Sequence, residues 1–394
     1  MKPNPGGQLD PNNIVGRDEL VTRMWEILDG RSIYMNDVRR VGKTQVLIKM
    51  KGSIPPGWMV ISQDLGGYHT TAEFATWVFR ESYKVLSGKN RAFRMMAGLL
   101  GQLKGLEIAG VVKLPGGAIA PWKEVLIRTF SDLEEQLAEQ DKRLVFLWDE
   151  VPFLLDNIAK REGADSAMQV MDVLRSLSQT HQRIRFVLTG SVGLHHVLAN
   201  LRAEGYAGSP LNHMERIAPG PLAASDACKL AAELLRGANV PCADLVVCAA
   251  AAAEAVGHVP FYIHKLVAHL PKTGPVSPET IETTLAKEIF HPDNDWDLAH
   301  FRQRIPLYYG KDDKLVFAIL DAVAAAEAPI ALEAIRRGVS SRMVFDDVEL
   351  LLRLLDLLQK DHYFERDTNG SYAFRFPLVR RWWRFDRSLF PAKP

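Results

Sequence analysis

The first half of the chain alternates short apolar runs with longer stretches of helical periodicity. The apolar runs occupy residues 33–35, 58–61, 144–148 and 186–188. Each run is apolar throughout, which is typical of strands covered on both faces. Amphipathic helices are predicted between and beside these runs, at 18–28, 44–51, 72–86, 123–139 and 167–180. The alternation predicts an α/β fold, in which a parallel sheet carries helices on both faces.

The pattern changes twice in the second half. Beyond about residue 221 the strand-like runs stop, and a helical bundle is predicted at 223–237, 243–256, 262–270 and 277–288. Beyond about residue 312, helices at 314–327, 331–338 and 346–360 precede a hairpin pattern at 363–374 and a last helix from Pro377. Three helices followed by a hairpin are the layout of a winged helix. We therefore predict an α/β core at 1–220, a helical lid and linker at 221–310, and a winged-helix domain at 311–394.

Composition narrows the function classes. The 394 residues are 47% hydrophobic, which is enough to form the cores of two or three domains. A formal net charge of +1 gives the chain no bulk attraction to nucleic acid or anionic membrane, although local basic patches remain open. The N-terminus has no apolar signal segment, and the most apolar run, 245–256, is too short to span a bilayer. We therefore expect a cytoplasmic protein with no membrane partner.

Metal-binding patterns of cysteine and histidine are not evident. Cys228, Cys242 and Cys248 have no CxxC spacing and lie in an apolar helical stretch, so they are interpreted as reduced, buried thiols. The His195-His196 pair and His258 also lack ligand spacing and are interpreted as helix or lid residues.

A phosphate-binding loop is predicted where the first strand meets the next helix. Such a loop supplies backbone N–H groups, a lysine and a hydroxyl at the spacing Gly-x-x-x-x-Gly-Lys-Ser/Thr. Gly42 would let the backbone approach the phosphates, Lys43 would reach the β- and γ-phosphates, and Thr44 would bind Mg²⁺. The helix N-terminus adds its dipole. Taken alone, the same residues also fit a surface helix that begins at a glycine.

One position of this loop departs from the pattern. Asp37 stands where the first glycine is expected. Because a carboxylate facing the phosphates would repel them, we predict that the Asp37 side chain points outward.

A pair of carboxylates follows the third apolar run. Asp149 and Glu150 stand directly after 144–148, at the carboxyl end of a predicted buried strand, where open α/β sheets bind ligands. Asp149 is suited to hold Mg²⁺ and Glu150 to activate an attacking water. The alternative is two solvated acids that begin a loop, and the order of the two motifs favours the catalytic interpretation. The fourth run ends in Thr189-Gly190-Ser191, where a polar side chain would face the γ-phosphate, unless this is an ordinary turn.

Taken in order, these segments resemble the archaeal-type ATPases of the STAND branch of P-loop NTPases, which are relatives of the AAA+ proteins. Asn4-Pro5 with 14–20 resembles the N-terminal motif that borders the adenine, and 39–44 resembles a P-loop in which the double arginine is usual. Residues 148–150 resemble the Walker B motif, and 189–191 the sensor strand. The lid motif, the linker and the closing element of the family are matched by 257–262, 301–310 and 374–383.

The resemblance implies a P-loop NTPase fold that uses ATP or ADP with Mg²⁺. It assigns nucleotide-binding roles to Val15, Gly16, Arg17, Arg39, Arg40, Val41, Gly42, Lys43, Thr44, Gln45 and Pro260. It assigns Mg²⁺ to Thr44 and Asp149, and catalytic roles to Lys43, Glu150 and Ser191.

Two departures from the family pattern bear on the rate of hydrolysis. Asp37-Val38 replaces the usual Gly-Pro, and Met214 stands where the family often has an arginine that adds charge near the nucleotide. Arg216 is a candidate substitute. The chain is therefore expected to be an ATPase, forming ADP and phosphate, that is slow or needs a partner's arginine.

The C-terminal region offers two candidate surfaces. The third winged helix, 346–360, is leucine-rich and acidic at its start, which favours a core or protein-interface role over reading DNA. The last helix carries basic side chains among aromatic ones: Arg375, Arg380, Arg381, Arg384 and Arg387 with Phe376, Trp382, Trp383 and Phe385. Such a set can bind phosphate backbone and stack bases. The favoured alternative is a packing helix with buried aromatics and solvated or paired arginines.

Three functional hypotheses follow. The first is an ATP-operated switch that regulates a separate effector protein in defence, signalling or mobile-element functions, as the resemblance implies. The second is a DNA-binding AAA+-like ATPase, resembling replication initiators or transposition regulators, which would form nucleotide-dependent homo-oligomers and bind DNA through Arg380, Arg381, Arg384 and Arg387. The third is a scaffold that holds ADP permanently without turnover.

Overall fold

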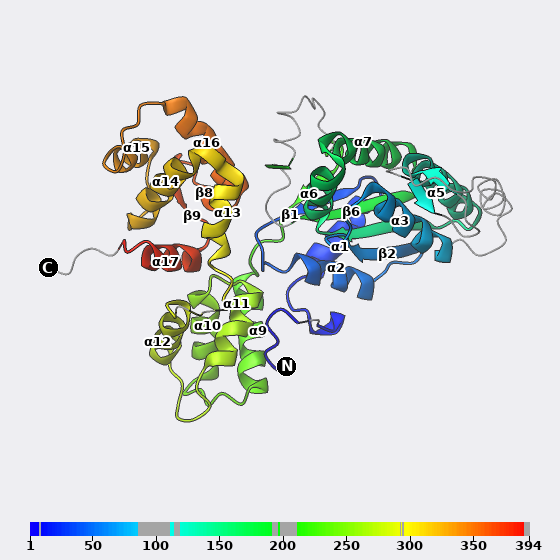
Figure 1. Cartoon of the computed structure of the whole chain (residues 1–394). Coiled ribbons are helices and arrows are strands. Elements are labelled where there is room, and N and C mark those ends of the chain that lie inside the picture. Colours follow the sequence, from blue (N-terminus) through cyan, green and yellow to red (C-terminus); the bar gives the residue numbers. More distant parts are fainter. Residues whose placement is uncertain are drawn as a thin grey trace. The chain divides into compact units, whose positions relative to one another are not determined.

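The computed structural model (Figure 1) describes residues 1–7, 9–85, 111–113, 119–190, 196–197, 211–291, 293 and 295–389. The chain divides into two compact units. Unit 1 comprises Met1–Arg17, Val38–Gly42 and Gly220–Pro394, and unit 2 comprises Asp18–Asp37 and Lys43–Pro219. The boundaries of the three predicted domains stay predictions.

Unit 2 contains a five-stranded parallel sheet. Its strands are β1 (Ile33–Asn36), β2 (Trp58–Asp64), β5 (Arg143–Asp149), β6 (Ile184–Gly190) and β7 (Glu215–Ile217), in the order β2-β5-β6-β1-β7. Each neighbouring pair is parallel. The predicted parallel sheet is confirmed, and the four predicted strands are each longer than the apolar runs that indicated them.

The helices of unit 2 are α1 (Asp18–Leu28), α2 (Lys43–Gly52), α3 (Thr71–Val85), α5 (Trp122–Glu139), α6 (Val151–Glu162) and α7 (Ala164–Thr180). They cover both faces of the sheet, as the alternation predicted (Figure 1). Side chains of β5 alternate between two cores: Phe146 packs with α3, α5, α6 and α7, whereas Val145 packs with α1 and α2. Fully burying such a side chain stabilises the fold by about 1.5–3 kcal/mol. A short antiparallel hairpin, β3 (Val111–Lys113) and β4 (Ile119–Pro121), precedes α5.

The middle of the chain folds into four helices within unit 1: α9 (Ala224–Gly237), α10 (Leu245–Ala255), α11 (Pro260–His269) and α12 (Pro278–Ile289). Polar caps fix two of their starts. The Asp244 carboxylate accepts from the backbone N–H groups of Val246 and Val247, and Ser277 forms a capping box with Thr280. These caps satisfy N–H groups that the first helical turn leaves without partners.

The C-terminal part of unit 1 has the layout of a winged helix, as predicted. Helices α14 (Asp313–Ala325), α15 (Leu332–Ser340) and α16 (Val348–Lys360) precede a hairpin of β8 (Phe364–Arg366) and β9 (Tyr372–Phe374). Helix α13 (His300–Tyr309) leads into this domain and α17 (Pro377–Asp386) closes it. The buried residues of α16 are Leu351, Leu354, Leu355 and Leu358, so one face of this leucine-rich helix belongs to the core.

A buried polar network joins α13 to the hairpin. The Arg304 guanidinium donates to the Tyr363 hydroxyl at 2.7 Å and to the Asp361 backbone carbonyl at 3.0 Å. The Tyr309 hydroxyl donates to the Asp361 carboxylate. Burial, followed by the negative charge of Asp361, raises the pKa of Tyr309. These bonds satisfy polar groups that would otherwise be costly to bury. Among the described residues, no helix combines the length and the apolar character needed to cross a membrane.

Candidate nucleotide-binding site

The lysine of the predicted phosphate loop begins α2. Lys43 is 6% exposed, and its ammonium donates to the backbone carbonyl of Asp37 at 2.7 Å. Asp37 itself is completely buried. The prediction that its side chain points outward is therefore wrong. A buried carboxylate requires polar partners within the protein, which is how position 37 accommodates a charge in place of the usual glycine.

The two predicted Mg²⁺ residues meet at the carboxyl edge of the sheet. The Thr44 hydroxyl donates to Asp149 at 2.6 Å, although these residues are 105 positions apart. The Thr189 hydroxyl and the backbone N–H of Glu150 also donate to the Asp149 carboxylate. Parallel registration of β5 with β6, and of β6 with β1, brings the ends of these strands to one edge.

Hydroxyl and carboxylate oxygens are suitable ligands for Mg²⁺, which takes one or two protein oxygens and completes its shell with phosphates and water. Within the described ranges, no three His, Cys, Asp or Glu side chains gather into a metal site. The Thr44–Asp149 pair fits a Mg²⁺ ion that arrives with a nucleotide. Their role as ligands stays a prediction.

Glu150 occupies a strained turn between β5 and α6. Its φ is +56°, and it is the N-cap of α6. A left-handed conformation at a residue other than glycine costs about 1–3 kcal/mol and is frequent at functional sites. The turn is closely packed, since a β-carbon built at Gly190 would lie 2.6 Å from the Pro152 ring.

The third predicted catalytic residue, Ser191, lies outside the described residues. The polar side chain that the structure brings to Asp149 is Thr189, two positions earlier. Thr189 belongs to the predicted segment 189–191, in which a polar side chain was expected to face the γ-phosphate, although the catalytic role was assigned to Ser191. The available signal was the position of Thr189 on β6. Successive positions of a strand face opposite sides, so Thr189 and Gly190 face different sides of the sheet.

Tyr34 of β1 is a second residue that the sequence analysis missed. It is buried, and burial raises the pKa of its hydroxyl; the nearby Arg216 opposes this shift and Glu150 adds to it. The charges of Glu150, the predicted general base, and Arg216, the candidate substitute arginine, therefore both act on the Tyr34 hydroxyl. Arg216 is exposed on β7, directly beside Tyr34 in register. Met214 is buried in the core of unit 2.

Within unit 1, Arg17 attaches the N-terminal motif to the phosphate loop. Its guanidinium donates to the carbonyl of Val41 at 3.1 Å and to that of Gly220 at 2.7 Å. Gly16 has a φ of +69°, and a β-carbon there would lie 2.6 Å from Asp226. Only glycine therefore fits this close approach to α9.

The remaining predicted nucleotide-binding residues are distributed over both units. Val15 lies beside Gly16, Pro260 is the first residue of α11, and Gln45 lies in the first turn of α2. Gly42 has a φ of +102°.

The two arginines of the phosphate loop share one carboxylate. Arg40 donates to Asp297 at 2.8 Å, and Arg39 lies 3.6 Å from the same oxygen. Asp297 was not among the residues predicted from the sequence.

The basic side chains of α17 have partners within unit 1. Arg381 pairs with Glu282, Arg384 with Glu327 at 3.1 Å, and Arg387 with Asp321 at 2.9 Å. Arg380 donates to backbone carbonyls of Ala324 and Ala326. The aromatic residues Phe376, Trp382 and Trp383 are buried. This is the arrangement of a packing helix. Binding of DNA through Arg380, Arg381, Arg384 and Arg387 would require these contacts to break, and it stays a prediction.

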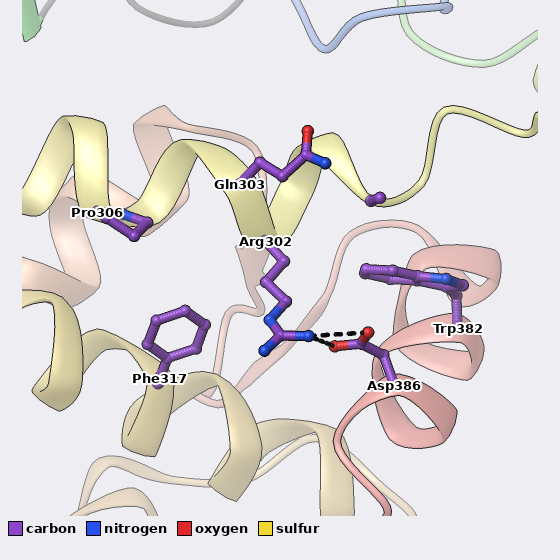
Figure 2. A pocket seen from close by; sticks show the side chains of 7 residues that line it. Arg302, Gln303, Pro306, Phe317, Trp382 and Asp386 are labelled. Atoms are coloured by element: carbon purple, nitrogen blue, oxygen red, sulfur yellow. Dashed lines mark hydrogen bonds and ion pairs between the residues drawn. The ribbon is translucent and has the colours of Figure 1, made fainter. Parts of the chain in front are cut away.

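Two hollows lie elsewhere. One, of about 420 Å³ in unit 1, is lined by α13, α14 and α17, and the Arg302–Asp386 ion pair spans it beside Phe317 and Trp382 (Figure 2). The other, of about 650 Å³ in unit 2, is lined by Trp58, Arg143 and Arg185 at the beginnings of β2, β5 and β6. It lies at the amino-terminal edge of the sheet. Because parallel sheets bind ligands at their carboxyl edge, we place the candidate site at Asp149 instead.

Comparisons with known proteins complete the description. No protein-family model matches the sequence, and no curated protein matches it. The Walker-type ATPase PABY2304 of Pyrococcus abyssi is similar in structure, with a TM-score of 0.64 and 18% identity over 95% of this chain and 97% of that one. The ORC2 protein of Aeropyrum pernix, solved with ADPNP and ADP, has a TM-score of 0.50 and 11% identity over 94% of this chain and 92% of that one. The chain therefore has the fold of a Walker-type P-loop ATPase.

Proposed function

We propose that this protein binds ATP with Mg²⁺ and hydrolyses it slowly to ADP and phosphate. One observation carries the proposal: the Thr44 hydroxyl lies 2.6 Å from the Asp149 carboxylate, at the carboxyl edge of a parallel sheet. Lys43 begins the helix that holds Thr44. A cation, a hydroxyl and a carboxylate thus follow the order and topology that a bound triphosphate requires.

Lys43 would change partners when a nucleotide binds. Its ammonium now donates to the neutral carbonyl of Asp37. A phosphate oxygen is a stronger acceptor, because it carries a negative charge that also attracts the ammonium. Thr44 and Asp149 would hold Mg²⁺, which neutralises charge on the phosphate oxygens.

Glu150 is the proposed general base. It follows Asp149 directly, and its left-handed backbone holds it between the strand and α6. The rate of ATP hydrolysis is expected to be low because of the residue at position 214. Met214 is buried in the core and brings no positive charge to the position where related sequences often carry an arginine. An arginine from a partner, or Arg216, would raise the rate by stabilising the charge of the transition state.

We infer further that hydrolysis serves a switch of the STAND type, which acts on a separate effector protein in the cytoplasm and changes its homo-oligomeric state with the bound nucleotide. The paired arginines of α17 favour this function over DNA binding. A scaffold that keeps ADP permanently is the remaining alternative. It requires co-purified ADP and no turnover even with the effector present.

The test compares the ATP affinity of the wild-type protein, Lys43→Ala and Lys51→Ala by isothermal titration calorimetry. Lys43→Ala should weaken ATP binding by about 100-fold or more, because it removes the cation from the phosphates. Lys51→Ala removes an exposed lysine from the same helix and should leave affinity unchanged. Equal affinity of all three proteins would contradict the proposal.

The effector is sought with a variant that binds ATP without hydrolysing it. Glu150→Gln, loaded with ATP, should retain the effector in a pull-down, followed by identification of bound protein and nucleic acid. Recovery of duplex DNA without protein would favour the second hypothesis.

A further inference from the structure

Two residues of unit 1 with unusual backbones are joined by an ion pair. Arg40, in the phosphate loop, has a φ of +72°, and Asp297, which follows α12, has a φ of +59°. The Arg40 guanidinium donates to the Asp297 carboxylate at 2.8 Å. Left-handed backbone is unfavourable for any side chain that carries a β-carbon and persists where the surroundings hold it.

Several elements converge on the Arg40 guanidinium. It lies 4.5 Å from the ring centroid of Phe261 in α11, a distance at which cation and ring attract each other. A β-carbon built at Gly6 would lie 3.6 Å from Arg40 Nη1, so the N-terminal segment closes over the same group. The guanidinium is thus held by a carboxylate, a ring and the backbone of a third segment.

Asp297 is itself held in place. His300, the first residue of α13, contacts the backbone carbonyl of Asp297 through Nδ1. Its ring nitrogen also lies 3.9 Å from the Asp297 carboxylate. Burial lowers the pKa of His300 to about 4, so the imidazole is neutral at physiological pH and does not compete with Arg40 for the carboxylate.

The strained residue stands within the phosphate loop. Arg40 precedes Val41, whose carbonyl is held by Arg17, and Gly42, with a φ of +102°. The directions of the backbone N–H groups at Val41 and Gly42 depend on the dihedrals of the residue before them. A phosphate cradle of backbone N–H groups works only if those dihedrals are fixed.

We propose that Asp297 is a positioning residue of the phosphate loop: it holds Arg40 in its left-handed conformation and so pre-shapes the loop for phosphate. This proposal rests on the proposed ATP-binding function. Arg39, on the same carboxylate at 3.6 Å, contributes less because its side chain is half exposed.

Asp297→Asn is the sharpest test, because asparagine tolerates φ of +59° as aspartate does and has nearly the same shape. It removes only the charge. We expect ATP to bind about 5–10-fold more weakly, because an ion pair becomes a weaker bond from the guanidinium to a neutral amide, and kcat to change less than KM. Thermal unfolding of the variant separates this effect from loss of folding.

A rescue identifies the backbone as the cause. Glycine adopts φ of +72° without a side-chain clash, so Arg40→Gly no longer needs Asp297 to hold the loop. In the Arg40→Gly background, Asp297→Asn should change ATP affinity by less than about twofold. Arg302→Ala is the matched control. It breaks the Arg302–Asp386 pair (Figure 2), an ion pair of comparable exposure in the same unit, and should leave affinity unchanged.

Three results would overturn the proposal. Tighter ATP binding by Asp297→Asn would mean that the carboxylate competes with phosphate for the arginines. An equal loss with and without Arg40→Gly would mean that Asp297 acts elsewhere. Wild-type protein that binds no ATP would end both proposals. Wild-type binding that Lys43→Ala abolishes and Asp297→Asn leaves unchanged would end this one alone.

Discussion

The carboxyl edge of β5 and β6 and the last helix, α17, both place charged side chains among aromatic ones, yet they treat charge in opposite ways. Asp149 accepts from the hydroxyls of Thr44 and Thr189 and from one backbone N–H, which are neutral donors. On α17, three arginines each face a carboxylate. A carboxylate held by neutral donors keeps its charge available to a cation. The charge of a paired arginine is already neutralised by a carboxylate of the same unit.

This difference separates a candidate site from a packing surface that has the same residue types. In a region of low dielectric constant, a carboxylate that is held by neutral donors attracts a cation strongly. On α17, Trp382 and Trp383 are buried in the core of unit 1, and the arginines have partners within that unit. Removing single charges from each region tests this difference.

Asp149→Asn should have the largest effect. It keeps the shape of the side chain but removes the charge that would hold Mg²⁺, so we expect Mg²⁺-dependent phosphate release to fall by at least about 100-fold. Asp156→Asn on the exposed side of α6, where Asp156 pairs with Lys160, should leave it unchanged. Turnover measured across a Mg²⁺ titration checks both, and an unaltered Mg²⁺ dependence in Asp149→Asn would remove the Asp149 side of the comparison.

Glu150→Gln should separate binding from chemistry. A general base contributes about 10²–10⁴-fold to a rate, so we expect kcat to fall by about 10²–10³-fold while ATP affinity stays within about threefold. Single-turnover phosphate release and calorimetry measure the two quantities. A variant that keeps most of its turnover would assign the base to another residue.

Arg387→Ala should destabilise the C-terminal part of unit 1. Asp321 is buried and bonds both Arg387 and the Trp383 indole N–H, so the variant leaves a buried carboxylate without its counter-ion. We expect a loss of about 2 kcal/mol in the free energy of unfolding, measured in urea, with unchanged ATP affinity. Adding Asp321→Asn should recover part of the loss, because it removes the unpaired charge.

His264 differs from both regions, because its burial disfavours the charged form of the imidazole. Its Nδ1 accepts from the backbone N–H of Asn4 at 3.1 Å, and burial lowers its pKa to about 4. In the unfolded chain the pKa is about 6.5. Because the unfolded state binds the proton first, stability is full above about pH 6.5 and falls as the pH drops toward 4. We expect a loss of about 1–2 kcal/mol between pH 7 and 5, measured by thermal unfolding and reduced in His264→Gln.

Arg384→Ala should have the smallest effect. Its partner Glu327 is 80% exposed, and such surface pairs contribute about 0–1 kcal/mol. The same variant tests the DNA hypothesis. Suppose that duplex DNA binds, that binding weakens steeply with salt, and that this salt dependence becomes shallower in Arg384→Ala. That result would show that the arginines of α17 are available to phosphates, and it would contradict the difference drawn above.

The central strands and most helices could be predicted because their signals are local. Continuous apolar runs identified β1, β2, β5 and β6, and helical periodicity at 277–288 identified α12. Strand β7 has only three residues and one buried apolar side chain, so pairing with β1 defines it more than its own sequence does.

Helix α13 was missed for a different reason. The segment was interpreted as a linker through its resemblance to the family, and it contains Pro306, which lacks a backbone N–H and normally interrupts a helix. Tertiary contacts of Phe301, Arg304 and Ile305, all buried, stabilise the helix around it.

The candidate site was predictable to the extent that its motifs are contiguous. The positions of Lys43, Thr44, Asp149 and Glu150 follow from two short segments at strand ends. Asp297 was not predictable, because its relation to Arg40 spans 257 positions and leaves no local pattern. The direction of Asp37 was predicted wrongly, since repulsion by phosphate was considered and burial within the fold was not.

The buried network around Arg304 has an evolutionary consequence. Hydrogen bonds link Arg304, Tyr363, Tyr309 and Asp361 in the interior, so replacing any single member leaves the others with unmatched polar atoms. Replacing several at once with apolar side chains of similar volume would be much less harmful. In an alignment of homologues, these four positions should therefore covary, changing as a group or not at all.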